Sequence, residues 1–219
     1  MSCFIHLRNG LSALALALGF VGGLWAQSNP AVVITPQVRA ELMVWAPQGL
    51  GPGQNMWLGL QIQHQKDWHT YWKNSGDSGL PTELAWTLPT GWNAGELAWP
   101  TPKKFQLGPL ANHGFDGTVL LPTPFQISEP QAAGFDFTVK LTANWLVCKQ
   151  ECIPQEGDFV VRVPVKGSTV MAPEAFQAAL ANQAQMLTGK HEAVIAEDGR
   201  TLTLKVETLP PELSSGAWT

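Results

Sequence analysis

Two cysteines, Cys148 and Cys152, carry the most distinctive chemistry in this sequence. They lie in the segment WLVCKQECIP, residues 145 to 154, with three residues between them. Four steps along a continuous strand would place their Cα atoms about 13 Å apart, whereas a disulfide requires roughly 4.4 to 6.8 Å. The backbone must therefore turn at Lys149, Gln150 and Glu151 if the pair is bonded. A hairpin tip or one helical turn would meet this requirement, and either would place the pair at the end of a strand, near solvent.

Three kinds of site fit such a pair: a redox-active dithiol, a structural disulfide and a metal site. A closed loop of about five residues restricts the unfolded chain by only about 2 kcal/mol, against roughly 4.7 kcal/mol for a loop of a hundred. A sulfur near solvent suits attack by the thiolate of another protein. Two thiolates without further Cys or His at ligand spacing make a weak metal site. The order of preference is redox pair, structural disulfide, metal site, and all three remain open on the residues alone.

The N-terminal residues 1–26 are typical of a secretory signal peptide. An apolar run extends from Leu11 to Leu24, Arg8 precedes it, and the segment has no acidic residue. This run is shorter than the 18 to 20 apolar residues of a membrane-spanning helix and is interrupted by glycines. Cleavage after Ala26 would remove Cys3 and leave two cysteines in a compartment where disulfides persist. The sequence therefore predicts export, with pairing of the two remaining cysteines as the default.

Alternating apolar and polar residues, the period of a half-buried strand, recur along residues 27–167. The turn-forming residues, Gly 21 and Pro 17, are spread along the chain. Several short strands at this spacing predict an all-β, immunoglobulin-like antiparallel sandwich. The segment from Trp99 to Gly117 is rich in Pro and Gly and is expected to be rich in loops. The alternating segments are Val38 to Val44, Met56 to Ile62, Leu84 to Leu88, Val119 to Ile127, Phe135 to Val147 and Phe159 to Val165.

The character of the chain changes after Gly167. Pro173 suits the start of an amphipathic helix, which we expect to end before Gly189. A hairpin around Asp198 and Gly199 follows. Two strands and a helix are too few for an independent domain. We therefore interpret residues 168–219 as the incomplete start of a second β-module.

Three segments together resemble a known family. They are WLVCKQECIP, the segment HTYWKNSGDSGLPTELAW at residues 69 to 86, and WPTPKKFQLGPLANHGFDGTVLLP at residues 99 to 122. Over about residues 30 to 166 the chain resembles the N-terminal periplasmic domain of the DsbD/ScsB family of transmembrane thiol-disulfide interchange proteins. The resemblance implies an immunoglobulin-like fold and a location in the periplasm. It also implies an electron relay: a membrane-embedded donor and a thioredoxin-like domain or protein supply electrons, and periplasmic disulfide proteins accept them.

The resemblance also implies roles for individual residues. Cys152 would form mixed disulfides with partner proteins, Cys148 would resolve them, and the redox-active disulfide would serve without any cofactor or metal. An aromatic side chain from a cap loop would shield the cysteines, with Phe105 as the first candidate and Phe115 as the second. The residues between the cysteines have opposed charges, since Lys149 would stabilise a thiolate and Glu151 would oppose it.

Composition argues against a nucleic-acid partner and suggests a second possible function. The formal net charge is −4 and no cluster of Lys and Arg stands out, so we do not expect nucleic acid as a partner. We expect no direct membrane contact by this region once the leader is removed. The sequence contains ten Trp, which suggests a carbohydrate-binding platform or, more broadly, a non-catalytic β-sandwich binding module with a structural disulfide. His64, His69 and His113 are conceivable metal ligands, but we expect them to be surface or loop residues.

Overall fold

The computed structural model describes residues 31–128, 136–165, 169–184 and 189–207. The leader at residues 1–26, the boundary at Gly167 and the chain beyond residue 207 lie outside the described residues. The signal peptide and the second β-module therefore remain predictions.

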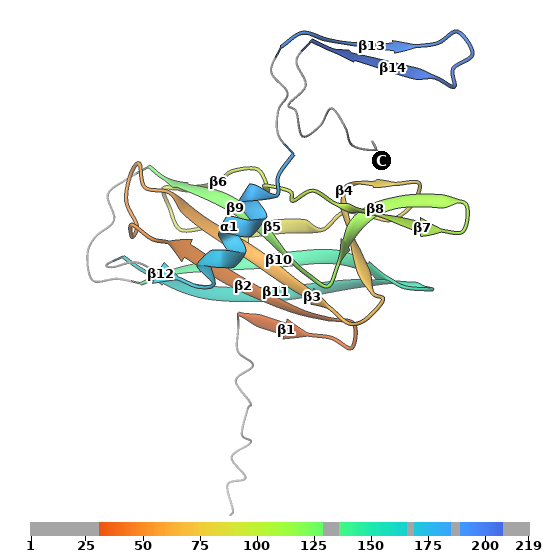
Figure 1. Cartoon of the computed structure of the whole chain (residues 1–219). Coiled ribbons are helices and arrows are strands. Elements are labelled where there is room, and N and C mark those ends of the chain that lie inside the picture. The colour runs from red at the N-terminus through yellow and green to blue at the C-terminus, as the bar shows by residue number, and fades with distance from the viewer. Residues whose placement is uncertain (1–30, 129–135, 166–168, 185–188, 208–219) are drawn as a thin grey trace, which may run out of the picture.

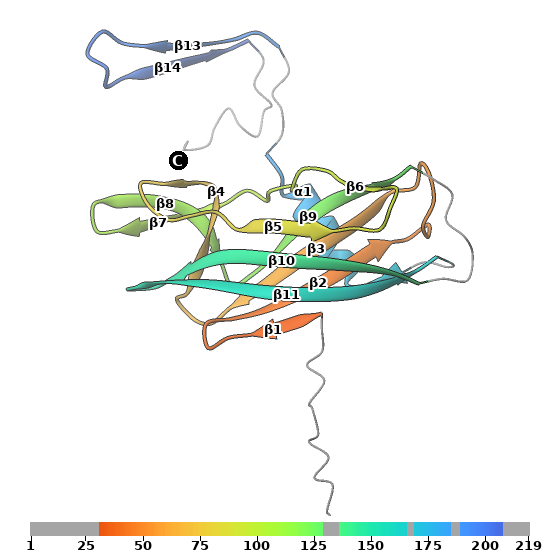
Figure 2. The same cartoon turned by 180° about the vertical axis from the view of Figure 1, so that it is seen from behind.

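Two antiparallel sheets form a sandwich, as the alternating segments predicted (Figures 1 and 2). The first sheet has the order β1-β2-β3-β9-β6, and β12 also pairs with β2. Its strands are β1 (Val32–Ile34), β2 (Val38–Ala46), β3 (Met56–His64), β9 (Thr118–Ile127), β6 (Trp92–Ala94) and β12 (Thr169–Val170). The second sheet has the order β11-β10-β4-β8-β7, and β5 pairs with β10. Its strands are β11 (Cys152–Pro164), β10 (Asp136–Cys148), β4 (His69–Gly76), β8 (Leu110–Asp116), β7 (Lys103–Leu107) and β5 (Glu83–Thr87).

The core lies between the two sheets and is built from the inward positions of the strands. Val38, Ala40, Leu42 and Val44 of β2 are completely buried, and every second residue of β10 from Val139 to Val147 is buried opposite them. Burial of this apolar surface is the main force that holds the sheets together. Trp145 and Trp92 are also buried in this core, and Trp86 packs against it. These three rings are therefore core residues and are not available as a carbohydrate platform.

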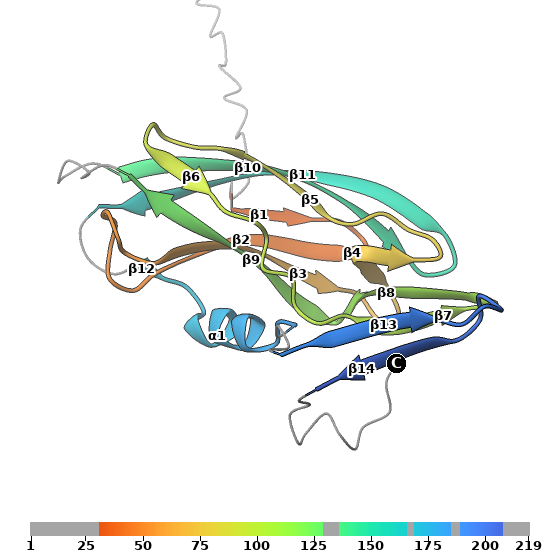
Figure 3. The same cartoon turned by 90° about the horizontal axis from the view of Figure 1, so that it is seen from above.

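One short helix, α1 (Pro173–Ala181), covers the outer face of the first sheet (Figure 3). Phe176 is completely buried there, and its ring stacks on Trp45 with 5.7 Å between centroids. Gly59 of β3 makes room for the helix, since a Cβ at this position would lie 3.0 Å from the Phe176 ring and 2.7 Å from Leu120. The helix is a packed part of the sandwich.

The helix is shorter than predicted. It ends at Ala181, because the carbonyl of Asn182 accepts hydrogen bonds from the backbone N–H of Thr101 at 2.7 Å and from its hydroxyl at 2.9 Å. This tertiary contact takes the chain away from the helix axis. The strands β13 (His191–Ile195) and β14 (Leu202–Val206) then form the expected hairpin, and most of their residues are exposed.

The segment that we expected to be rich in loops contains a further hairpin. Strands β7 and β8 pair from Lys103 opposite Gly114 to Leu107 opposite Leu110, and Gly108 occupies the turn with φ +60. The prediction was wrong because most residues of β7 are polar or exposed and so lack the alternation of a half-buried strand. The hairpin is held by the pairing of β8 with β4, which starts at His69 opposite Asp116.

Candidate functional site

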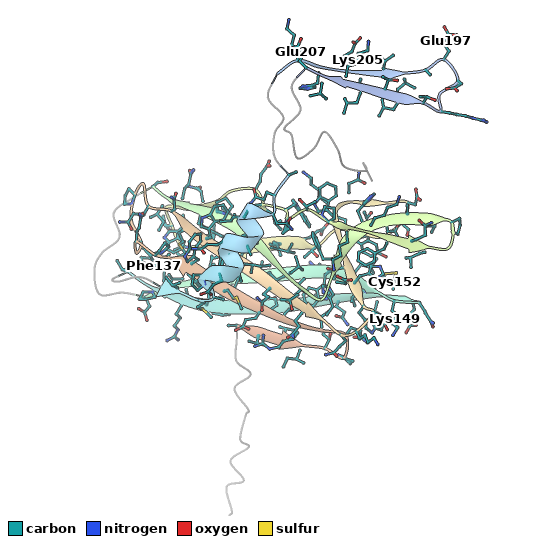
Figure 4. The ribbon with its side chains drawn as sticks, in the orientation of Figure 1. Phe137, Lys149, Cys152, Glu197, Lys205 and Glu207 are labelled. Carbon is teal, nitrogen blue, oxygen red and sulfur yellow. A yellow bond between two sulfur atoms is a disulfide. The ribbon has the colours of Figure 1, made fainter. Side chains whose placement is uncertain are left out.

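The two cysteines face each other at the tip of the β10–β11 hairpin. The antiparallel pairing runs without interruption to Cys148 opposite Cys152, where the Cα atoms are 4.2 Å apart and a disulfide joins the sulfurs. Lys149 donates its backbone N–H to the carbonyl of Glu151 and so closes the three-residue turn. Figure 4 shows Cys152 and Lys149 at one end of the sandwich and Phe137 at the other. Of the two turns that the cysteine spacing allowed, a hairpin tip or one helical turn, the structure has the hairpin tip.

The two cysteines differ sharply in exposure. Cys148 has 1% of its surface exposed, whereas Cys152 is an exposed residue. Both occupy outward positions of the second sheet, since Trp145 and Val147 alternate with Cys148 and point into the core. An attacking thiolate from another protein can thus approach Cys152 from solvent, while Cys148 is covered.

Tyr71 of β4 lies directly beside the exposed cysteine. Its hydroxyl is 3.8 Å from the Cys152 Sγ, and only 1% of the residue is exposed. Burial raises the pKa of Tyr71, so its hydroxyl stays protonated and can donate a hydrogen bond to the sulfur. Gly79, with φ +97, lies flat against this ring, because a Cβ there would come within 2.3 Å of it. Tyr71 is therefore fixed between the disulfide and the loop that follows β4.

His69 lies beside the other cysteine. It pairs with Cys148 across the strands, and its ring stacks on Phe105 at 4.7 Å and meets the edge of Tyr71 at 5.3 Å. Its Nε2 is buried and has no hydrogen-bond partner among the described residues. Burial lowers the pKa of His69, and the opposing attraction of Asp116 is smaller, so the neutral ring is favoured. The cysteine pair therefore borders a row of three stacked or edge-packed rings.

His64 and His69 were expected at the surface or in loops, and this prediction was wrong. His64 is 7% exposed and His69 is 4% exposed. His64 is held by the carbonyl of Gly117 at 2.9 Å and the hydroxyl of Thr70 at 3.0 Å, so it has a structural role. Within the described ranges, no three His, Cys, Asp or Glu side chains are grouped to hold a metal ion.

The two candidate shielding residues lie on opposite faces of the second sheet. Phe105 is half-buried on the outward face, where it stacks on His69 beside the cysteines. Phe115 is 6% exposed, pairs with the buried Thr70 and stacks on Trp99 in the core. The second choice, Phe115, is therefore corrected to a core residue. Phe105 remains the candidate, and its shielding role stays a prediction.

The turn between the cysteines carries one basic and one acidic side chain, Lys149 and Glu151. The Nζ of Lys149 forms an ion pair of 3.1 Å with Asp67, in the turn between β3 and β4. Glu151 is exposed at the tip. Because both partners of the Lys149 ion pair are well exposed, water screens the interaction and its contribution to stability is small. Sequence reasoning missed Tyr71 and Asp67, and it did not place His69 beside the cysteines. The alternating segment WHTYW, residues 68 to 72, was the signal for His69 and Tyr71.

Comparisons with known proteins bear on the family and the fold of this chain. The family model described as the N-terminal domain of thiol:disulfide interchange protein DsbD matches residues 39–164. Among solved structures, the N-terminal periplasmic domain of ScsB from Proteus mirabilis superposes with a TM-score of 0.54 at 16% identity, over 76% of this chain. The chain spans 65% of that structure, less than two thirds of its length. A yeast GGA1 GAE domain gives a TM-score of 0.30 at 10% identity, over 59% of this chain and 96% of that one.

A search of curated protein sequences gave no match. No helix in the described part of the chain is long and apolar enough to span a membrane. The likeness to ScsB supports the immunoglobulin-like sandwich, and the family match covers more than half of the chain. The chain therefore belongs to the family of the N-terminal domain of thiol:disulfide interchange protein DsbD.

Proposed function

We propose that this chain is a periplasmic thiol-disulfide relay domain of the protein-disulfide reductase kind, and that Cys148 and Cys152 carry its electrons. The observation that supports this most strongly is the disulfide at an exposed hairpin tip, with Cys148 buried and Cys152 exposed. A bond of this kind adds little to stability because its loop is short, but it is accessible to exchange.

In the proposed reaction the reduced form meets a partner protein that has a disulfide. The Cys152 thiolate attacks one partner sulfur, a bond forms between them, and the second partner sulfur leaves as a thiolate and takes up a proton. The Cys148 thiolate then attacks the Cys152 sulfur, which restores the internal disulfide and releases the first partner sulfur, also as a thiol. Two electrons and two protons have passed to the partner.

Recharging follows the same steps in reverse. A dithiol on a thioredoxin-like domain or protein reduces the Cys148–Cys152 disulfide, and a membrane-embedded donor supplies that dithiol with electrons. The electrons reside in sulfur–hydrogen and sulfur–sulfur bonds throughout, so the proposed chemistry uses no separate cofactor.

The surrounding residues have distinct parts in this proposal. The Tyr71 hydroxyl stabilises the Cys152 thiolate by donating a hydrogen bond, because its raised pKa keeps it protonated. His69 and Phe105 cover Cys148 with neutral rings, so that its sulfur is reached from Cys152 and not from solvent.

Trapping tests the assignment of the two sulfurs. The variant Cys148→Ala should accumulate a mixed disulfide between Cys152 and a partner in periplasmic extract, seen as a band that disappears on reduction. The matched variant Cys152→Ala should give little or none, because its remaining sulfur is covered. If neither variant captures a partner, the relay proposal is wrong.

The rival function is a binding module with a structural disulfide. Redox titration separates the two, because a reduction potential below about −300 mV is typical of inert structural bonds. We expect a higher potential for the Cys148–Cys152 pair.

A further inference from the structure

An open groove lies next to the disulfide on the outward face of the second sheet. It has a volume of about 320 Å³, and its apolar lining includes Leu80, Pro81, Leu146 and Pro154. Pro81 is bridged to Tyr71, the residue whose hydroxyl contacts Cys152. The groove therefore continues from the cysteine site.

The strand register arranges the disulfide and the groove beside it in successive rows. The first row is Cys148 opposite Cys152, and the next outward row is Leu146 opposite Pro154. The third row has Asn144 in the centre, with Glu156 of β11 and Glu83 of β5 on either side. Successive outward rows are two residues apart, about 6.6 Å along the strands. An extended segment that follows the strands would meet a sulfur, then an apolar pair, then two carboxylates.

The apolar and acidic residues of the groove indicate which side chains of a bound segment would be complementary to it. Leu80 is 65% exposed, so the apolar lining has no cover within the described part of the chain. Glu83 and Glu156 are both exposed, and no described Lys or Arg lines the groove to neutralise them. An apolar side chain followed by a cation would be complementary to this surface.

We propose that this groove binds the polypeptide segment that carries the partner's reactive cysteine. The segment binds in an extended conformation, with an apolar residue two positions from its cysteine and a Lys or Arg four positions from it. This inference rests on the proposed function, since it places the partner's sulfur against Cys152.

Activated peptides test the specificity directly. The probes are the peptides CALAK, CASAK and CALAE and the reversed KALAC, KASAC and EALAC, each with its cysteine joined to 2-thiopyridine. The Cys152 thiolate of the Cys148→Ala variant attacks the peptide sulfur, the bond to the pyridine sulfur breaks, and the thiopyridine that leaves takes up a proton and is followed by absorbance. Each rate is divided by the rate with the neutral small probe 2,2′-dithiodipyridine.

In at least one chain direction we expect the Leu–Lys probe to react about tenfold faster than the probe with Ser in place of Leu, because a buried Leu side chain gains apolar contact. In the same direction it should react roughly threefold faster than the probe with Glu in place of Lys, and this preference should fall as salt is added. The double substitution Glu83→Gln with Glu156→Gln should remove the preference for Lys over Glu. The matched control Glu96→Gln changes an exposed glutamate outside the groove and should keep it.

Other outcomes would overturn the inference. Equal relative rates for all six peptides would mean that the groove does not select the partner segment, while leaving the relay chemistry intact. A fall in the relative peptide rates as the protein concentration rises would assign the groove to a second copy of the chain. If the folded Cys148→Ala variant does not react even with the small probe, the proposed function fails together with the inference.

Discussion

The two outer faces of the sandwich differ in whether another element covers them. On the first sheet, α1 covers the outward aromatic residues, and Phe176 is completely buried against Trp45 and Leu120. On the second sheet the outward face carries the disulfide, and a half-buried Phe105 and an open groove lie beside it. One face is closed by packing and contributes stability, whereas the other stays open to contact by another protein. Stability and exchange chemistry are thus separated by the core.

The largest expected effect is on the closed face. Phe176→Ala should lower the free energy of unfolding by about 3 to 5 kcal/mol, because it removes a fully buried ring and leaves a cavity. Phe105→Ala should cost less than about 1.5 kcal/mol, since this ring is already partly exposed. Urea unfolding followed by tryptophan fluorescence measures both. Similar losses for the two variants would contradict the distinction between the faces.

The open face should also respond in the reactivity of its disulfide. Phe105→Ala should raise the rate at which dithiothreitol reduces the Cys148–Cys152 disulfide by about tenfold, equivalent to about 1.4 kcal/mol in activation free energy. The ring of Phe137, half-buried at the other end of the sandwich, offers a matched control. Phe137→Ala should leave the reduction rate unchanged. An equal rate in the Phe105 variant and the parent protein would remove Phe105 as a shield.

A smaller effect is expected at the hydroxyl beside the exposed sulfur. Tyr71→Phe in the Cys148→Ala background should raise the pKa of the Cys152 thiol by about one unit, because the thiolate loses a hydrogen-bond donor. The pH dependence of alkylation by iodoacetamide reports this pKa. The ring is kept, so a change in packing alone would alter the overall rate without moving the midpoint.

The smallest expected effect concerns the two buried histidines. Burial is the main cause that lowers the pKa of both His64 and His69 from the ordinary value of 6.5. Below pH 6.5 the two histidines therefore bind protons more readily in the unfolded chain than in the folded chain. The free energy of unfolding should fall as pH decreases, until the pH is below the lowered pKa values of the folded chain. Urea unfolding at pH 7.5 and 5.5 measures the change. His69→Gln should reduce the loss, and an unchanged or larger loss in this variant would contradict the assignment.

The sequence determined the local features of this protein. Alternation along β2, β3, β9, β10 and β11 could be read directly, because a strand with one buried face repeats every two residues. The turn at Lys149 to Glu151 followed from the reach of a disulfide. These features depend on residues that are close together in the chain, so tertiary contacts were not needed to find them.

Tertiary structure decided what surrounds the cysteines. Tyr71 lies 81 residues before Cys152, and β4 brings it to the sulfur only because β4 pairs with both β8 and β10. The β7–β8 hairpin has no clear apolar period, so its strands could not be predicted from the local pattern, and only the resemblance pointed to Phe105 as a cap residue. Glu83 and Glu156 share a row with Asn144 through the register of three strands. Pairing between distant strands depends on how the two sheets bury their common core, and a local pattern of residues does not contain that information.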